Sequence, residues 1–200
     1  MNLLTNTNQK MKKTSKLNNT RVFEFNLPAW KSITGKIICP FASECIKFCF
    51  AKKGTYLYKN VRDKYETNYQ LTKQDNFTDL IQIEINKKKP NYIRIHSSGD
   101  FYSPKYLQKW IKLAVNNPEI IFYGYTKSIP LFKALKFTPN NFVFCYSKGS
   151  KVDHLINENK DRFAQIFKTE EDLINSDFIN ASDNDLNVLT DNNKIGLIYH

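Results

Sequence analysis

The chain has 200 residues, of which 41% are hydrophobic and 14% aromatic, so its composition excludes an intrinsically disordered protein. The formal net charge is +11 and is unevenly spread: residues 1–64 carry 13 Lys/Arg against 3 Asp/Glu, whereas residues 151–200 carry 5 against 10. A basic front is typical of proteins that bind nucleic acid or phosphorylated small molecules, and equally typical of an ordinary solvated face.

Targeting and membrane signals are absent from the sequence. No apolar run approaches the roughly 20 residues that span a bilayer, and residues 1–20 lack the apolar stretch of a secretory signal. We therefore expect a soluble, cytoplasmic protein with no membrane partner, whose four cysteines are free thiols or metal ligands rather than disulfides. Residues 1–20 are polar, basic and aperiodic, which predicts a flexible basic tail before a single α/β domain over residues 21–200.

Strand and helix patterns alternate along the rest of the chain, with short connections between them. In chain order, the patterns predict a strand at 21–27, helical structure over 43–72 with an interruption near Gly54, a helix at 76–89, a strand at 92–95, a helix at 103–117, a strand at 119–128, a short helix at 129–137, a strand at 141–150, a short helical stretch within 151–167, and last strands at 177–182 and 194–200. This alternation predicts an α/β fold whose parallel βαβ units form a partial or curled (β/α) barrel.

Polar or reactive residues follow several of the apolar strands, and the carboxyl ends of parallel strands are where ligands gather in such folds. These residues are Cys39, the run at 96–100, the run at 125–128 and the run at 145–148. The sequence therefore predicts one site in which cysteine, histidine, aspartate and lysine meet.

Three of the four cysteines, Cys39, Cys45 and Cys49, lie within eleven residues at the spacing C-x5-C-x3-C. Three thiolates on one short loop suit a 4Fe-4S cluster, with one iron left open to another ligand. Zinc is the alternative metal. Its fourth ligand would be one of four distant residues: Cys145, His96, His154 or His200. A third interpretation makes the three thiols small, buried apolar residues.

The cysteine loop resembles that of the radical S-adenosylmethionine enzymes, whose usual spacing is C-x3-C-x2-C with an aromatic residue before the third cysteine. Here Phe48 precedes Cys49, but both gaps are longer. A second likeness follows the strand at 92–95. In that superfamily a Gly-Gly-Glu-Pro turn closes the second strand and binds the amino group of the cofactor. Ser98-Gly99-Asp100 stands at this place, with Asp for Glu and no following Pro.

This resemblance implies a radical-SAM-like barrel that holds a 4Fe-4S cluster on the three cysteines and binds S-adenosylmethionine. Ser98, Gly99 and Asp100 would hold the ammonium group of the cofactor, and Phe48 would pack on its adenine. Two further residues are assigned from their position at strand ends alone: Lys127 would meet a carboxylate or phosphate, and Ser147 a ribose hydroxyl.

Simpler roles are open for the same residues. Asp100 is placed to cap the helix predicted to begin near Ser103, and Lys127 fits an ordinary surface lysine. His96 fits a hydrogen-bonded, half-buried histidine. Cys145 is expected to be a packed thiol rather than a fourth metal ligand.

A closer resemblance covers most of the chain, from about residue 24 to residue 200. The stretches FNLPAWKS, CPFASECIKFCFAKKGTYLY, RIHSSGDFYS, FYGYTKS and KIGLIYH are similar to the gene product 88 family of phages and plasmids. That family has no assigned biochemical activity. The resemblance therefore implies a mobile genetic element as the source, and it names no reaction.

Three functions follow from these patterns. The first is an iron–sulfur protein of a mobile genetic element, of the radical S-adenosylmethionine type, with an unknown substrate. The second is a nucleic-acid-binding module of a phage or plasmid, with a structural zinc or cluster and tyrosines for stacking. The third and weakest is a metal-dependent hydrolase, which lacks the paired ligands that such sites need. Its residues would be His96, Asp100, Asp153 and His154.

Overall fold

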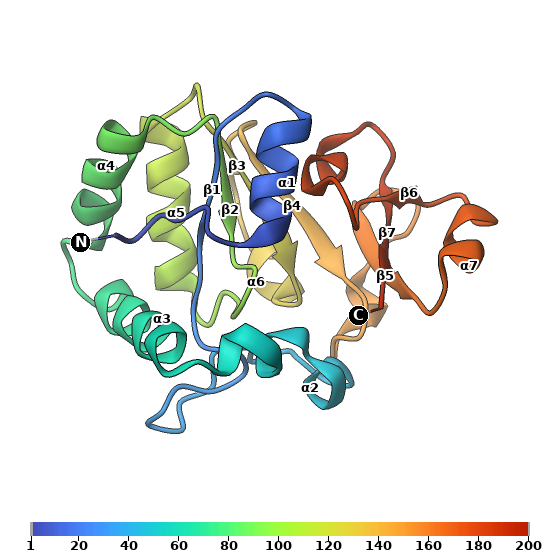
Figure 1. The fold of residues 1–200 in the computed structure, drawn as a ribbon, viewed down its shortest axis with the longest axis horizontal. Helices are drawn as coiled ribbons and strands as arrows, with labels where there is room; N and C mark the ends of the chain where they lie inside the picture. The colour runs from blue at the N-terminus through green and yellow to red at the C-terminus, as the bar shows by residue number, and fades with distance from the viewer. Residues whose placement is uncertain (1, 200) are drawn as a thin grey trace.

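The structure is a computed structural model that describes residues 2–199 (Figure 1). Its strands form one sheet in the order β1-β2-β3-β4-β5-β7-β6, and each neighbouring pair runs parallel. The sheet curls into a half-barrel, which confirms the predicted α/β fold with a partial, curled (β/α) barrel. The strands are β1 (Val22–Phe25), β2 (Tyr92–Ile95), β3 (Ile121–Thr126), β4 (Phe142–Ser147), β5 (Phe163–Phe167), β6 (Ile179–Asn180) and β7 (Lys194–Ile198).

Helices connect most of these strands and begin at residues that the sequence marks. For example, α5 begins at Pro104, and the Ser103 side chain before it accepts a hydrogen bond from the backbone N–H of Tyr106. The α-helices are α1 (Gln9–Leu17), α2 (Cys45–Phe48), α3 (Lys59–Thr72), α4 (Phe77–Lys88), α5 (Pro104–Asn116), α6 (Ile129–Lys133) and α7 (Glu170–Ile174). The short 3-10 helices are η1 (Phe50–Lys52), η2 (Gly54–Leu57), η3 (Asp153–Leu155) and η4 (Asp185–Leu189). Among residues 2–199, no helix is both long enough and apolar enough to cross a bilayer.

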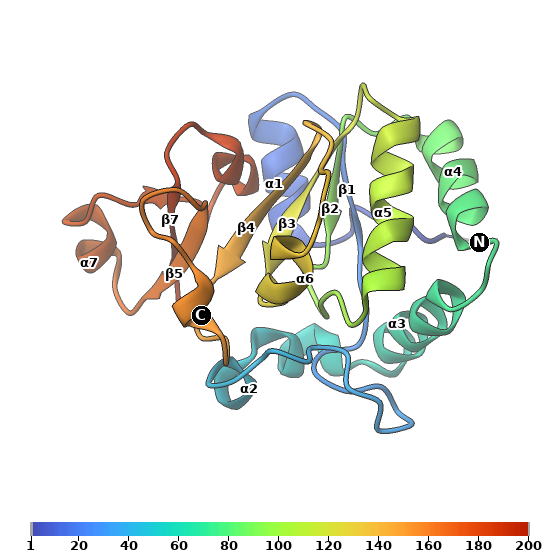
Figure 2. The same cartoon turned by 180° about the vertical axis from the view of Figure 1, so that it is seen from behind.

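The larger core lies between the outer face of the sheet and the helices α4, α5 and α6; in Figure 2, α6 lies in front of the strands, and α5 and α4 lie to the side of β1. Trp110 of α5 is fully buried there, with its ring 5.3 Å from that of Phe25 on β1 and 5.6 Å from that of Phe77 on α4. Edge-on aromatic pairs of this kind contribute about 0.5–1.5 kcal/mol each beyond the burial of area. This layer fixes β1 and β2, and with them the loops that follow both strands.

The inner face of the sheet carries a second, smaller core, and α1 packs on β1 and η4 beside it. The flexible basic tail predicted for residues 1–20 is therefore wrong for residues 2–20. Met11 of α1 is buried in this core, and the backbone N–H groups of Leu3 and Leu4 donate to the Glu84 carboxylate on α4. Few apolar residues lie in α1, so its stability comes from these tertiary contacts rather than from its own pattern.

Two further segments differ from the sequence prediction. The stretch 151–167, predicted to contain a short helix, holds η3 and then β5, which pairs with β7 over five residues. The helical region predicted over 43–72 is continuous only in α3, because α2, η1 and η2 break residues 45–57 into short turns. A short apolar run such as that of β5 is compatible with a strand and with a buried helix, and its pairing with β7 shows that it is a strand.

Candidate cofactor site at the carboxyl ends of the strands

A cavity of about 430 Å³ lies at the carboxyl ends of the strands. Its walls come from the loop after β1, from α2 and η1, from the turn after β2, and from the ends of β3, β4 and β7. All nine residues predicted to bind a metal or cofactor line it: Cys39, Cys45, Cys49, Phe48, Ser98, Gly99, Asp100, Lys127 and Ser147. Parallel strands place their carboxyl ends at one edge of a sheet, and this brings together residues more than 100 positions apart.

The three cysteines are free and half-buried. Burial raises the pKa of the Cys39 thiol, and the nearby Asp100 carboxylate raises it further; burial also raises the pKa of Cys49. Both thiols are therefore protonated at neutral pH, and a metal that binds them must displace protons. Within residues 2–199, no group of three or more His, Cys, Asp or Glu side chains is arranged to hold a metal ion.

A zinc ion and an iron–sulfur cluster place different demands on such thiols. One zinc ion needs its ligands to converge on a point, whereas each thiolate of a 4Fe-4S cluster binds its own iron and the sulfurs stand further apart. Two of the distant candidates for a fourth zinc ligand lie elsewhere: Cys145 is fully buried in the inner core, and His154 is exposed. His200 lies outside the described residues. Thiols are ligands for soft metals, and three of them line this cavity.

The Asp100 carboxylate ties the turn after β2 to the end of β3. It accepts hydrogen bonds from its neighbour Phe101 N (2.7 Å), from Thr126 Oγ1 (2.6 Å) and from Lys127 N (2.8 Å). Burial raises the pKa of Asp100, and these three donors act in the opposite direction. Asp100 does not cap α5, because Ser103 does so itself. A carboxylate offers about four acceptor positions, and these donors use three of them.

The Ser98-Gly99 turn is held against the loop after β1. Ser98 N donates to Asn26 Oδ1 (3.1 Å), Ser98 Oγ donates to Leu27 O (2.8 Å), and Leu27 N donates to Ser98 O (2.9 Å). Gly99 has φ +85°, and a Cβ built there would stand 2.6 Å from Leu27 Cβ. The position therefore needs glycine both for its left-handed backbone and for this close approach. The turn forms a rigid cavity wall.

Lys127 and Ser147 join the ends of β3 and β4. The Lys127 ammonium donates to Ser147 Oγ (2.6 Å), to Ser147 O (3.2 Å) and to Lys148 O (2.8 Å). Lys127 is half-buried and lines the cavity, so the interpretation of it as an ordinary surface lysine is wrong. All three ammonium protons are used by these bonds, and a ligand would have to compete for one of them.

The sequence predicted His96 to be a hydrogen-bonded, half-buried histidine close to the site. It is buried rather than half-buried, and its Nε2 lies 2.8 Å from the Tyr106 hydroxyl. Burial, and then the charge of Arg94, lowers the pKa of His96 to about 3, so the imidazole is neutral. Its backbone has φ +66°, which is uncommon for a residue with a side chain. Its Nδ1 finds no hydrogen-bond partner within residues 2–199.

Sequence reasoning missed a buried charged group in the cavity wall. The Arg94 guanidinium pairs with Asp185 of η4, and Lys10 of α1 pairs with the same carboxylate at 2.8 Å. The guanidinium carbon lies 4.5 Å from the centre of the Tyr125 ring. Arg94 Nε and the Tyr125 hydroxyl are buried and lack hydrogen-bond partners among the described residues. The sequence did contain a sign of this group, because β2 and β3 carry polar side chains at alternate positions, which face the inner core.

The residues of the hydrolase hypothesis are not brought together. Asp153 accepts hydrogen bonds from Gly149 N and Ser150 N, both at 2.8 Å, and so closes its own turn. Neither Asp153 nor His154 is among the residues that line the cavity, which does contain His96 and Asp100.

Comparison with known proteins identifies relatives of the chain. The sequence profile of the gene product 88 family matches residues 2–200. The chain belongs to the gene product 88 family. Two relatives are the Gene 88 proteins of Mycobacterium phages L5 and D29. Each is 31% identical over 101 residues, which is 44% of this chain and 42% of the relative's own length. No solved structure matches.

Proposed function

We propose that the protein is an iron–sulfur enzyme of the radical S-adenosylmethionine type, with Cys39, Cys45 and Cys49 as the ligands of a 4Fe-4S cluster. The observation that carries the proposal is that three free thiols from one loop line the same cavity as the Ser98-Gly99-Asp100 turn. That cavity stands at the carboxyl ends of a curled parallel sheet, the usual ligand position in such folds.

The chain's own residues have distinct tasks under this proposal. The acceptor position left on Asp100 is suited to the ammonium group of S-adenosylmethionine, and Phe48 offers a ring to its adenine. A reduced cluster held by Cys39, Cys45 and Cys49 would supply the electron for reductive cleavage of the carbon–sulfur bond of S-adenosylmethionine. Arg94 Nε, His96 Nδ1 and the Tyr125 hydroxyl are left for the substrate.

The proposal also fits a reducing compartment. Four free cysteines, of which three are half-buried, persist in the cytoplasm, where thiols are kept reduced. We therefore expect the protein to act in the cytoplasm of the host cell, where the electron that the chemistry needs is also available.

Metal content tests the cluster. Protein purified without oxygen is expected to be brown and to hold about four irons and four sulfides per chain. Cys39→Ala, Cys45→Ala or Cys49→Ala should each lose most of this iron. Cys145→Ala is the matched control, because that thiol is buried in the inner core and is not among the cavity-lining residues, and it should keep the full content. A colourless protein with about one zinc per chain, or iron that follows Cys145, would overturn the proposal.

Cofactor turnover tests the activity separately. With reductant, the loaded protein is expected to release 5′-deoxyadenosine from added S-adenosylmethionine, and Asp100→Asn should weaken S-adenosylmethionine binding while the iron content is kept. A protein with a complete cluster that neither binds nor cleaves S-adenosylmethionine would show that the cluster has another task.

A further inference from the structure

Exposed aromatic side chains lie on and just after the turns η1 and η2, which contribute Phe50 and Tyr56 to the cavity lining. Phe50 is 53% exposed and Tyr58 is 60% exposed, on the short turns η1 and η2 and just after them. Trp30 and Tyr56 line the cavity beside them, and the Tyr56 ring lies 5.7 Å from that of Phe50. We call this surface, formed by residues 30–58, the rim.

The rim and the residues that follow it, into α3, carry mainly positive charge. Residues 30–64 contain eight Lys/Arg and only two Asp/Glu, and each acid is paired with a neighbour, Glu44 with Lys47 (2.9 Å) and Asp63 with Lys59 (2.5 Å). The other cations have no carboxylate partner among the described residues. They are Lys31, Lys36, Lys52, Lys53, Arg62 and Lys64.

Several of these ammonium groups stand over aromatic rings. Lys31 Nζ lies 4.2 Å and Lys52 Nζ 5.2 Å from the centre of the Trp30 ring, and Lys53 Nζ lies 5.7 Å from that of Tyr199. Cations beside aromatic rings are typical of surfaces that bind a single nucleic-acid strand, since phosphates meet the cations and unstacked bases meet the rings. A partner protein of ordinary composition would instead bury these cations without countercharge.

We propose that the rim binds single-stranded nucleic acid, with backbone phosphates on Lys52 and Lys53 and bases stacked on Phe50 and Tyr58. The surface has the two elements that such binding needs, unpaired positive charge and exposed ring faces, at the entrance of the cavity. The proposal does not depend on the cluster, because the four side chains are exposed and none is a thiol.

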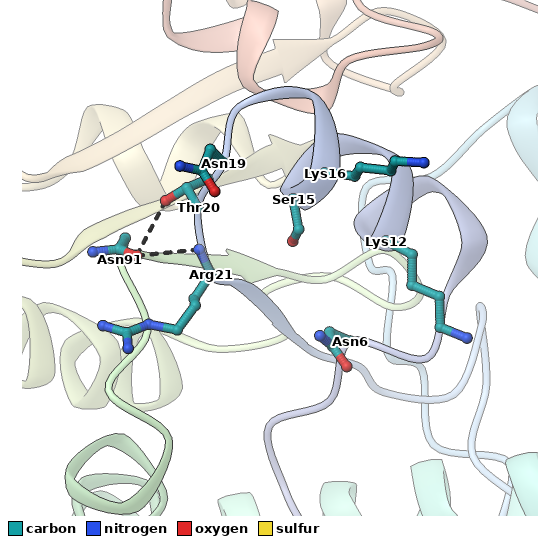
Figure 3. Close-up of a pocket in the computed structure, with 8 residues that line it drawn as sticks. All are labelled: Asn6, Lys12, Ser15, Lys16, Asn19, Thr20, Arg21 and Asn91. Atoms are coloured by element: carbon teal, nitrogen blue, oxygen red, sulfur yellow. Dashed lines mark hydrogen bonds between the residues drawn. The ribbon is translucent and has the colours of Figure 1, made fainter.

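A second basic surface offers a matched comparison. At the amino ends of β1 and β2, a shallow depression is lined by Lys12, Lys16 and Arg21 (Figure 3). Asn91 closes it by accepting hydrogen bonds from Thr20 Oγ1 and Arg21 N, both at 3.1 Å. This depression is as basic as the rim, but no aromatic side chain lines it. It therefore has the charge for phosphates and lacks rings for bases.

The test is binding of the full chain to a labelled oligothymidine of about 20 nucleotides, followed by fluorescence anisotropy over a range of salt concentrations. Replacing both Lys52 and Lys53 by Gln should weaken binding about tenfold or more. It should also reduce the slope of log affinity against log salt by about 1.4, since each phosphate contact on a single strand contributes about 0.7.

Ring variants separate stacking from charge. Phe50→Ala and Tyr58→Ala should each weaken binding about tenfold and leave the salt slope unchanged. The double variant Lys12→Gln/Lys16→Gln should keep the affinity within about twofold. All these side chains are exposed, and equal circular dichroism spectra would confirm that the variants fold.

Three results would overturn the proposal. The first is that the Lys12/Lys16 variant loses binding while the Lys52/Lys53 variant keeps it, which would place the contact at the other end of the sheet. The second is equal affinity for an abasic strand of the same length, which would remove the role of the rings. The third is equal affinity for poly-glutamate, which would make the surface a site for any polyanion. Iron content, measured on the same samples, shows independently whether the cluster proposal stands.

Discussion

Acidification from about pH 8 to about pH 5 is expected to destabilise the protein through one buried histidine. His96 is 3% exposed, and in the folded protein burial and the Arg94 charge lower its pKa from 6.5 to about 3. The folded state therefore keeps the imidazole neutral, while the unfolded chain binds a proton below about pH 6.5. Stability from this group is complete above the unfolded pKa, and it is lost as the pH falls toward the folded one.

The magnitude follows from the two pKa values. Each pH unit below the unfolded pKa costs about 1.36 kcal/mol until the folded pKa is reached. From about pH 8 to about pH 5, the free energy of unfolding should therefore fall by about 2 kcal/mol from His96 alone. Asp185, whose pKa is lowered because Arg94 and Lys10 offset its burial, adds a loss only at a lower pH, below the unfolded pKa of 3.8.

Urea unfolding at each pH measures this effect, with far-UV circular dichroism as the signal. His96→Asn is the informative variant, because asparagine tolerates a positive φ and does not titrate in this range. It should be less stable at about pH 8, by about 1–3 kcal/mol for the lost bond to Tyr106, and it should lose about 2 kcal/mol less than the unsubstituted protein between about pH 8 and 5.

The exposed His154 gives the control, and His154→Asn should show the pH dependence of the unsubstituted protein. Burial raises the pKa values of Glu24 and Asp100, and these carboxyls act in the opposite direction on acidification, so the difference between His96→Asn and the unsubstituted protein isolates His96. The reasoning is refuted if His96→Asn loses as much stability as the unsubstituted protein between about pH 8 and 5.

Three other changes test the fold. Gly99→Ala should lower the free energy of unfolding by about 1 kcal/mol because of its positive φ, and by about 1–3 kcal/mol more because of the contact with Leu27. Gly149→Ala, with φ +88° and open space around it, should lose only the backbone contribution. Equal urea midpoints for the two variants would contradict this. Deleting residues 1–17 should lower the melting temperature to near room temperature, because the deletion removes fully buried apolar side chains that contribute about 1.5–3 kcal/mol each. An unchanged melting temperature would indicate a flexible tail. Asp185→Asn should lower the free energy of unfolding, measured in urea, by about 3–5 kcal/mol, because Arg94 is left buried without a countercharge. Asp63→Asn, which breaks an exposed pair, should cost much less, and equal small losses in the two variants would refute this.

Strong periodicity made most of the sheet readable from the sequence. The strands β2, β3 and β4 and the helix α5 were predicted near their observed bounds, because apolar runs, turn residues and the Ser103-Pro104 start agree with one another. The helix α1 was missed for the opposite reason. Its inward residues, Met11 and Thr14, give a weak apolar face, and contacts with segments far along the chain stabilise it.

That the candidate residues meet at one edge of the sheet was predictable, but the bonds among them were not. Parallel topology alone brings the cysteine loop, the turn after β2 and the ends of β3 and β4 to one edge. Whether Asp100 bonds to Thr126 or leaves both oxygens to a ligand depends on turn geometry that no sequence pattern encodes. The pair of Lys10 with Asp185 joins residues 175 positions apart, and only the packing of α1 on η4 brings them together.

The inner side of the half-barrel has an apolar half and a polar half, and the polar half is suited to binding a ligand. Toward the amino ends, Met11 and Val22 fill the space as a core would. Toward the carboxyl ends, the cavity wall holds buried polar atoms of Arg94, His96 and Tyr125 without partners in the described chain. Unpartnered buried groups cost about 1–3 kcal/mol each, and a sheet that needed only to fold would be more stable with apolar residues there. Such costs persist where a bound molecule recovers them, so this cavity is where we expect the ligand of the protein to bind.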